Sequence, residues 1–157
     1  MAKAKRKTAP GDVATNRQAS FRYHLLDRLE AGIVLRGTEV KSLRTNGAQM
    51  RDSYATLTDG ELWLHNLHIP HYQPAARENH EPDRSRKLLL HRSEIDRLVG
   101  RIRERGLTVV PTRMYFTGPH AKVEIALARG KDVGDKREAI REREQKREME
   151  RAVGRRR

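Results

Sequence analysis

The chain has 157 residues and carries 34 Lys and Arg against 21 Asp and Glu, a net charge of +13. This length provides one domain of ordinary size. The absence of cysteine excludes a disulfide-stapled fold, a Cys-based zinc site and a thiol nucleophile. No apolar run approaches the ~20 residues that span a bilayer. We therefore expect a cytoplasmic protein without a membrane partner, whose charge suits a polyanion such as nucleic acid.

The positive charge is concentrated at the two ends of the chain. Residues 1–7 carry a net +4 and residues 129–157 a net +5, which leaves +4 for the whole centre. Like-charged arms are usually disordered alone and become ordered on a polyanion. We therefore predict a basic disordered arm over 1–13, an RNA-binding domain over 14–129 and a basic tail over 130–157.

The apolar pattern of the centre predicts short strands and two helices. In chain order, the expected elements are an extended segment over 20–36 with a bend at Gly32, a helix over 38–46 capped by Thr38 and ended by Gly47, a hairpin of 54–58 and 61–65 turned at Asp59-Gly60, a helix capped by Ser93 and ended by Gly106, and strands over 107–116 and 121–127. Pro111 forces an edge position or a break in its strand. Short strands joined by tight turns favour a small closed barrel.

The segment 135–151 is charged nearly throughout. Glu142 and Lys146 form a favourable i,i+4 pair, whereas Arg143 and Arg147 are unfavourable neighbours. Its sparse apolar residues leave no stripe with which to dock on the domain. We predict that this segment frays in isolation and is helical when a polyanion neutralises its Arg side.

Metal binding and catalysis find little support in the residue pattern. His65, His68 and His71 are spaced by three, which places neighbours on opposite faces of a strand, and Pro70 breaks a helical reading. We therefore expect no metal site and no cofactor. No phosphate-binding glycine motif or nucleophile motif is present, so we expect no enzyme; a ribonuclease that uses His and Lys stays open as an alternative.

Two basic clusters favour RNA. Lys41 to Arg44 lies on the first predicted helix, and Arg84 to Lys87 lies beside polar turn residues, where we expect phosphate contacts. Only 4% of the residues are aromatic, which leaves few rings for stacking single-stranded bases. A structured RNA read by shape and backbone fits better. A ribosomal or assembly protein is a second alternative.

Several motifs resemble the SmpB family, the SsrA-binding proteins that partner transfer-messenger RNA. They are, in order, Asn16-Arg-Gln-Ala19, Glu30-Ala-Gly-Ile33, Gly37-Thr-Glu-Val-Lys-Ser-Leu-Arg44, Asn79-x-x-Pro82, Arg86-Lys-Leu-Leu-Leu-His91, and Gly130-Lys131 followed by Asp135-Lys-Arg137. The resemblance covers roughly residues 14–137. Its most specific parts are Glu-Ala-Gly and the segment from Gly37 to Arg44.

The resemblance implies a mainly β fold with flanking helices: a small closed six-stranded OB-like barrel plus a basic C-terminal tail that is helical when bound. It implies an adaptor of trans-translation that binds the tRNA-like domain of transfer-messenger RNA and mimics the missing anticodon arm. The tail would enter the decoding centre and mRNA channel of a stalled ribosome. The implied partners are transfer-messenger RNA, the ribosome with its small-subunit rRNA and, indirectly, elongation factor Tu and alanyl-tRNA synthetase. We expect a monomer.

Carried over to matching positions, the resemblance implies RNA-binding roles for Glu30, Leu89, His91, Asn16, Lys41, Arg44 and Lys87. A carboxylate repels phosphate, so Glu30 would accept hydrogen bonds from base amino groups or ribose hydroxyls; a partner for a nearby Arg is the alternative reading. Leu89 could equally be a core residue.

In the tail, the residues implied for accommodation on the ribosome are Lys131, Asp135, Lys136 and Arg137. Two positions depart from the family pattern. Asp132 stands where a second Lys is common, and Gly134 stands where family members often have an aromatic residue or His. Gly134 cannot make the stacking contact on rRNA that the resemblance attributes to that ring.

Overall fold

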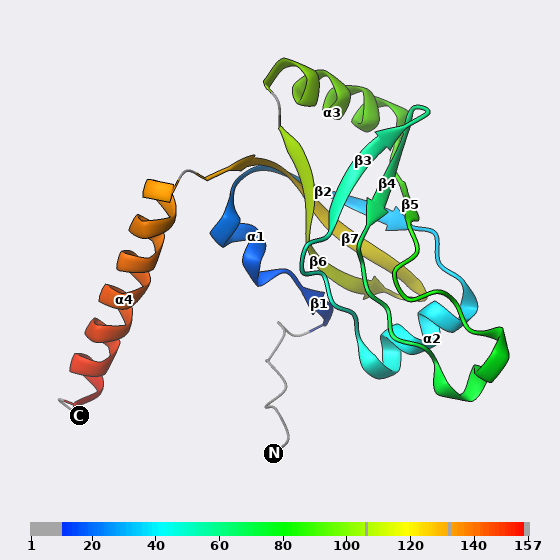
Figure 1. The fold of residues 1–157 in the computed structure, drawn as a ribbon, viewed down its shortest axis with the longest axis horizontal. Helices are drawn as coiled ribbons and strands as arrows, with labels where there is room; N and C mark the ends of the chain where they lie inside the picture. The colour runs from blue at the N-terminus through cyan, green and yellow to red at the C-terminus, as the bar shows by residue number, and fades with distance from the viewer. Residues whose placement is uncertain (1–10, 106, 132, 156–157) are drawn as a thin grey trace.

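A computed structural model describes residues 11–105, 107–131 and 133–155 (Figure 1). Its elements are β1 (Asp12–Thr15), α1 (Arg17–Arg22), β2 (Tyr23–Ile33), α2 (Gly37–Asn46), β3 (Tyr54–Thr58), β4 (Glu61–His65), the 3-10 helix η1 (Gln73–Glu78), β5 (Arg86–Leu89), α3 (Arg92–Arg105), β6 (Thr108–Thr117), β7 (His120–Gly130) and α4 (Val133–Arg155). Most of the predicted arm lies outside the described residues, but its last two residues, Asp12 and Val13, begin β1.

In the described part of the chain, seven antiparallel strands form one sheet in the order β1-β6-β3-β4-β5-β2-β7. Strand β6 also pairs with β7, so the pairings return to their start through every strand except β1. The prediction of a mainly β fold with flanking helices is confirmed. The sheet has one strand more than the six that we expected, because β1 adds to β6 through Asp12, Ala14 and Thr15.

The main core lies inside this circuit of strands. The inward side chains are at most 1% exposed at Leu62, Leu64, Leu88, Val109, Met114, Val123, Ile125 and Leu127. Helix α3 covers one end of the circuit through Leu98, as its apolar spacing predicts. Each buried Leu contributes roughly 2 kcal/mol to folding, so this cluster dominates the stability of the domain.

Helix α1 covers the outer side of the sheet. Its buried Ala19 packs against Val110 of β6 and Ala128 of β7. In the predicted strand over 121–127, burial alternates as expected up to Ile125. From Ile125 to Ala128 every residue is buried, because α1 packs on the outer side of β7 at Ala128. The predicted extended segment therefore begins at Tyr23, since α1 occupies the residues just before it.

Helix α2 ends as predicted but begins differently. Gly47 takes a φ of 72° at its C-terminus, a conformation that favours glycine. The N-cap is Arg36, whose backbone N–H donates to Glu39 Oε1 at 2.9 Å. The prediction of Thr38 as N-cap is wrong, because Thr38 lies inside the helix and its hydroxyl pairs with His80 Nδ1 at 3.0 Å. The Glu39 carboxylate, three residues after Arg36, accepts from the Arg36 amide, as in a capping box, so the N-cap lies two residues before Thr38.

The other predicted turns and caps have mixed outcomes. The hairpin of β3 and β4 is confirmed, with φ of 52° at Asp59 and 76° at Gly60. The prediction of Ser93 as N-cap is wrong, because α3 already begins at Arg92. Gly106 lies outside the described residues. Pro111 stays within β6, beside a break in the register of β6 and β7.

Helix α4 leaves the sheet after β7 and runs beside α1 (Figure 1). The Arg143 guanidinium lies 5.4 Å from the centre of the Phe21 ring on α1. Just before α4, Lys131 donates from its backbone N–H to the carbonyl of Arg22 at 3.0 Å and from Nζ to that of Ser20 at 2.9 Å. The base of the tail is therefore fastened to α1. Among the described helices, none is both long and apolar enough to cross a membrane.

Candidate RNA-binding surface

Strand register brings residues from four strands to one outward face. Gly32 of β2 pairs with Leu89 of β5 on one side and with Lys122 of β7 on the other. Lys122 in turn pairs with Tyr115 of β6. Glu30 lies two residues before Gly32 and therefore points to the same side. We call this surface, defined by Glu30, Gly32, Leu89, Tyr115 and Lys122, the outer face.

A hollow of about 520 Å³ opens on the outer face. Its lining is formed by Glu30, Gly32, Leu89, Leu90, His91, Glu94 and Lys122. The structure thus brings together three residues that the resemblance implies: Glu30, Leu89 and His91. Leu89 is 50% exposed, so its interpretation as a core residue is wrong. The exposed leucine is available for an apolar contact with a ligand.

Gly32 makes room for this leucine. A Cβ atom at Gly32 would lie 3.2 Å from Leu89 Cβ, which is tighter than ordinary van der Waals contact. The missing side chain therefore lets Leu89 lie over β2, on the floor of the hollow. The sequence predicts a bulge or sharp bend at Gly32, but the shift in the register of β2 with β7 lies between Leu25 and Arg28.

The carboxylate of Glu30 is held by a phenol. Tyr115 Oη donates a hydrogen bond to Glu30 Oε2. Burial, this hydrogen bond and the negative charge of Glu30 raise the pKa of Tyr115 to about 12. The phenol is therefore protonated at neutral pH and remains a donor to Glu30.

The neighbouring arginines pair with a different carboxylate. Arg113 Nε lies 2.6 Å from Glu124 Oε2, and Arg28 Nη1 lies 3.6 Å from Glu124 Oε1. Burial raises the pKa of Glu124, but the hydrogen bond and charge of Arg113 outweigh it and leave the pKa below its usual value. Arg113 Nη1 also lies 3.2 Å from Asp12 Oδ1, and none of the ion pairs found in the described residues involves Glu30.

Lys87 lies at the edge of the outer face. It is two residues before Leu89 on β5, and its Nζ is 2.8 Å from Glu61 Oε1. Across the strand pair it faces Trp63 of β4. Both side chains point away from the core because their neighbours Leu62 and Leu88 are buried.

The other three implied RNA contacts lie away from the hollow. Lys41 and Arg44 are exposed on α2, where Lys41 Nζ is 5.8 Å from the Tyr72 ring and Arg44 is 4.1 Å from the Phe116 ring. Asn16 lies between β1 and α1, and its amide nitrogen donates to the carbonyl of Pro111 at 2.9 Å. The structure therefore divides the implied residues among three places.

The basic run from Arg84 to Lys87 is not a uniform phosphate-binding cluster. Arg86 is 0% exposed; it donates to the Glu39 carboxylate, to the carbonyl of Leu67 at 2.5 Å and to that of Pro82 at 3.0 Å. The expectation of a phosphate contact is wrong for Arg86, because its guanidinium is fully buried and no phosphate on the surface can contact it.

The partner of Arg86 is a buried acid on α2. Glu39 is 0% exposed and also accepts hydrogen bonds from Arg84. Burial raises the pKa of Glu39, but the backbone N–H of Arg36 and the side chains of Arg84 and Arg86 outweigh it, so the pKa lies below its usual value. This buried cluster fixes α2, and with it Lys41, against the strands.

The histidines make protein contacts. His65 lies between Thr56 Oγ1 at 2.7 Å and Ser85 Oγ at 2.8 Å, and His68 Nδ1 lies 2.8 Å from Asp83 Oδ1. Within the described ranges, no three ligating side chains converge on a point where a metal ion could be held.

The tail residues are only partly visible. Lys131 fastens the start of the tail to α1, as described above, and Arg137 is exposed on α4. Asp135 and Lys136 lie in the first turns of α4, but their side chains fall outside the described residues.

Three comparisons place the chain among known proteins. The family model described as SmpB protein matches residues 13–155. The SsrA-binding protein of Mycobacterium sp. (strain KMS) is 57% identical over 144 residues, which cover 92% of this chain and 86% of that protein. The SsrA-binding protein of Carboxydothermus hydrogenoformans is 52% identical over 141 residues, covering 90% of this chain and 95% of that protein.

A solved structure gives the same answer. It is described as "tmRNA-SmpB: a journey to the center of the bacterial ribosome". It superposes on this chain with a TM-score of 0.66 at 46% identity, covering 82% of this chain and 94% of that one. The matched fold, the matched family model and identities above one half lead to one conclusion: the chain belongs to the SmpB protein family.

Proposed function

We propose that this chain is an RNA-binding adaptor of trans-translation. Its domain binds the tRNA-like domain of transfer-messenger RNA and stands in for the missing anticodon arm, and its tail enters the decoding centre and mRNA channel of a stalled ribosome. The proposal is supported by the names of its relatives and by the ribosome-bound SmpB structure that it resembles. On this proposal the six-strand circuit is an OB-like barrel and the protein acts in the cytoplasm as a monomer.

One observation carries the proposal: Glu30, Leu89 and His91 converge on a single hollow with Lys122. The hollow offers a cation for phosphate, an apolar surface for a ribose or base, and a carboxylate held in place by Tyr115. These groups suit a folded RNA, which presents phosphates and ribose hydroxyls together. Lys87 at the rim, Lys41 and Arg44 on α2, and Asn16 would extend the contact.

The tail has a separate task on this proposal. Lys131, Asp135, Lys136 and Arg137 act at accommodation on the small-subunit rRNA, after transfer-messenger RNA is bound. Making and breaking bonds is left to other proteins: alanyl-tRNA synthetase charges the RNA and elongation factor Tu delivers it. The charged, largely exposed α4 fits a segment that exchanges its contact with α1 for a polyanionic channel.

A deletion tests this division of labour. Removing residues 130–157 should leave affinity for the tRNA-like domain within a few-fold of the full chain, while peptide tagging on stalled ribosomes is lost. Equal loss of both activities would contradict the proposal.

A substitution tests the hollow. Glu30→Ala should weaken binding to the tRNA-like domain in a gel-shift titration and leave the thermal midpoint near that of the wild type, because the side chain is exposed. Glu78→Ala, an exposed acid on η1, is the matched control. An unchanged dissociation constant for Glu30→Ala removes this residue from the site.

A further inference from the structure

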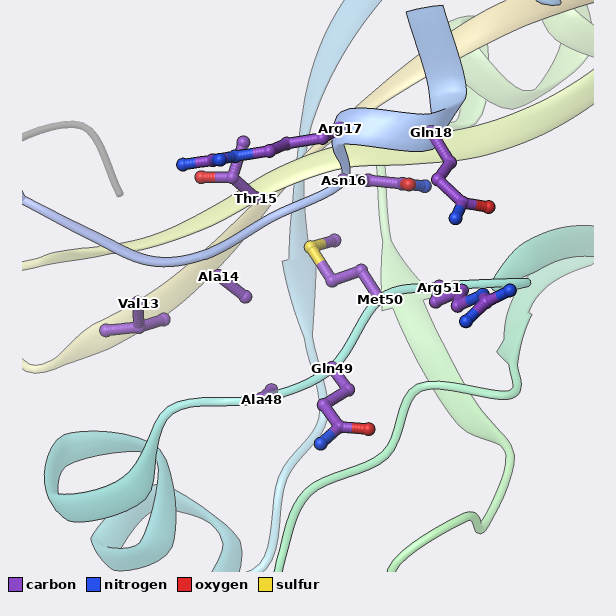
Figure 2. Close-up of a pocket in the computed structure, with 10 residues that line it drawn as sticks. All are labelled: Val13, Ala14, Thr15, Asn16, Arg17, Gln18, Ala48, Gln49, Met50 and Arg51. Atoms are coloured by element: carbon purple, nitrogen blue, oxygen red, sulfur yellow. The ribbon is translucent and has the colours of Figure 1, made fainter. Parts of the chain in front are cut away.

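A second hollow, also about 520 Å³, lies on another part of the molecule (Figure 2). One wall is formed by residues 13–18, which run from β1 into α1, and the other by residues 48–51, which follow α2. Its volume is within the range of ~300–1,000 Å³ that small-ligand pockets take. The lining of the first hollow shares no residue with it.

One polar atom in this wall has no hydrogen-bond partner among the described residues. Gln18 Oε1 is buried and accepts no hydrogen bond from any of the described residues. Buried acceptors are almost always paired, because leaving one unpaired is costly. Figure 2 shows the Gln18 side chain reaching toward the end of the hollow where Arg51 lies. A donor from outside the chain would satisfy this carbonyl.

The rest of the lining combines an apolar floor with polar residues. The floor is apolar: the Ala14 and Met50 side chains are both 2% exposed, and Figure 2 shows Met50 between the two walls. Polar residues also line the hollow: Gln49 is exposed, and Arg17 and Arg51 lie on opposite sides of the hollow. An apolar floor with amides and cations around it suits a flat ring that has a polar edge and an attached phosphate.

We propose that this hollow receives one unpaired RNA base that carries an exocyclic amino group, with adenine the best fit. The amino group donates to Gln18 Oε1, and the Gln18 amide nitrogen donates to the neighbouring ring nitrogen, which is the bidentate pairing of Gln with adenine. Arg17 and Arg51 contact the flanking phosphates. This inference rests on the proposed RNA-binding function and deepens it.

The first test uses single nucleotides on the isotope-labelled full chain. AMP should shift the NMR signals of the Gln18 and Gln49 side-chain amides and of the backbone over 13–18 and 48–51. Ribose 5-phosphate, at the same concentration, should leave the Gln18 amide signals in place. The inference is overturned if ribose 5-phosphate reproduces the AMP shifts, which means an anion site only, or if AMP shifts none of these signals.

The second test uses a variant and identifies the source of the base. Gln18→Leu removes the carbonyl, and Gln73→Leu on the exposed part of η1 is the matched control. Gln18→Leu should keep the thermal midpoint, since the lost atom has no partner, and should abolish the AMP shifts. It should lower affinity about tenfold or more, the effect of losing a bidentate pair, either for the tRNA-like domain or for small ribosomal subunits. No change toward either RNA overturns the inference.

Failure here is distinguishable from failure of the proposed function. Glu30→Ala lies on the outer face and reports binding of the tRNA-like domain there, whatever the Gln18 hollow contains. If Glu30→Ala weakens that binding while Gln18→Leu and AMP have no effect, the function stands and the base pocket falls. If the wild-type chain does not select the tRNA-like domain over a plain duplex, the proposed function falls irrespective of the AMP titration.

Discussion

Tyr115 on β6 donates a hydrogen bond to Glu30 on β2, across the intervening strand β7. The phenol keeps its proton because its pKa is raised to about 12. On the proposed function, the acceptor that Glu30 offers to RNA is therefore oriented by a side chain that does not itself line the hollow.

Tyr115→Phe should weaken binding of the tRNA-like domain by about fivefold, because the variant loses one hydrogen bond but keeps the ring. Titration by gel shift measures this effect. In a double-mutant cycle, Tyr115→Phe should add nothing once Glu30→Ala is present, since the phenol acts through the carboxylate. Full additivity of the two substitutions would show that Tyr115 contacts the RNA independently.

Glu39→Gln should destabilise the fold by roughly 3–5 kcal/mol, because it leaves the fully buried Arg86 guanidinium without its counter-charge. Urea unfolding at neutral pH measures the change. The matched control is Glu61→Gln, which breaks the partly exposed pair with Lys87 and should cost no more than ~1 kcal/mol. Similar losses for the two variants would contradict a structural role for the buried pair.

Stability should fall in acid. The pKa values of Glu39 and Glu124 lie below their ordinary value of 4.5 in the folded state, so their stabilisation is fully present above that value and is lost as pH falls through the folded-state pKa. The urea midpoint of the wild type should therefore drop between pH 5 and acid pH. The drop should be smaller in Glu39→Gln, and an identical pH dependence in both proteins would refute this assignment.

Two glycine substitutions should separate binding from folding. Gly32→Ala forces the exposed Leu89 aside, so it should lower RNA affinity and change the thermal midpoint little. Gly47→Ala should lower the thermal midpoint clearly, because φ is +72° and the added Cβ would lie 2.8 Å from the carbonyl oxygen of Val13. A larger loss of stability for Gly32→Ala than for Gly47→Ala would reverse this picture.

Glycine signals predicted two local features correctly, whereas both predicted helix N-caps are wrong. The turn at Asp59-Gly60 needs two positive φ values, and Gly47 ends α2 for the same reason. Sequence does not identify the cap of α2, because Thr38 is a good capping residue, while the Glu39 carboxylate can fix an N-cap two residues earlier through the Arg36 amide. Turns and helix ends can therefore be predicted from sequence where the backbone conformation requires glycine.

Contacts between residues far apart in the chain could not be predicted, and this limited the prediction of the candidate site. Nothing in the run from Arg84 to Lys87 shows that Arg86 is buried, since its partner Glu39 lies 47 residues away. The resemblance supplied Glu30, Leu89 and His91, which line one hollow. Lys122 had a signal of its own, because it alternates with buried residues on β7, but only the register of three strands shows that it lies beside Glu30.

The single tryptophan of the chain, Trp63, faces Lys87 at the edge of the outer face. Its indole emission is therefore a built-in optical reporter. An RNA that docks on the outer face will quench or shift that emission, whereas a nucleotide in the Gln18 hollow will leave it unchanged. Tryptophan fluorescence of the unlabelled protein can thus distinguish binding at the outer face from binding in the Gln18 hollow.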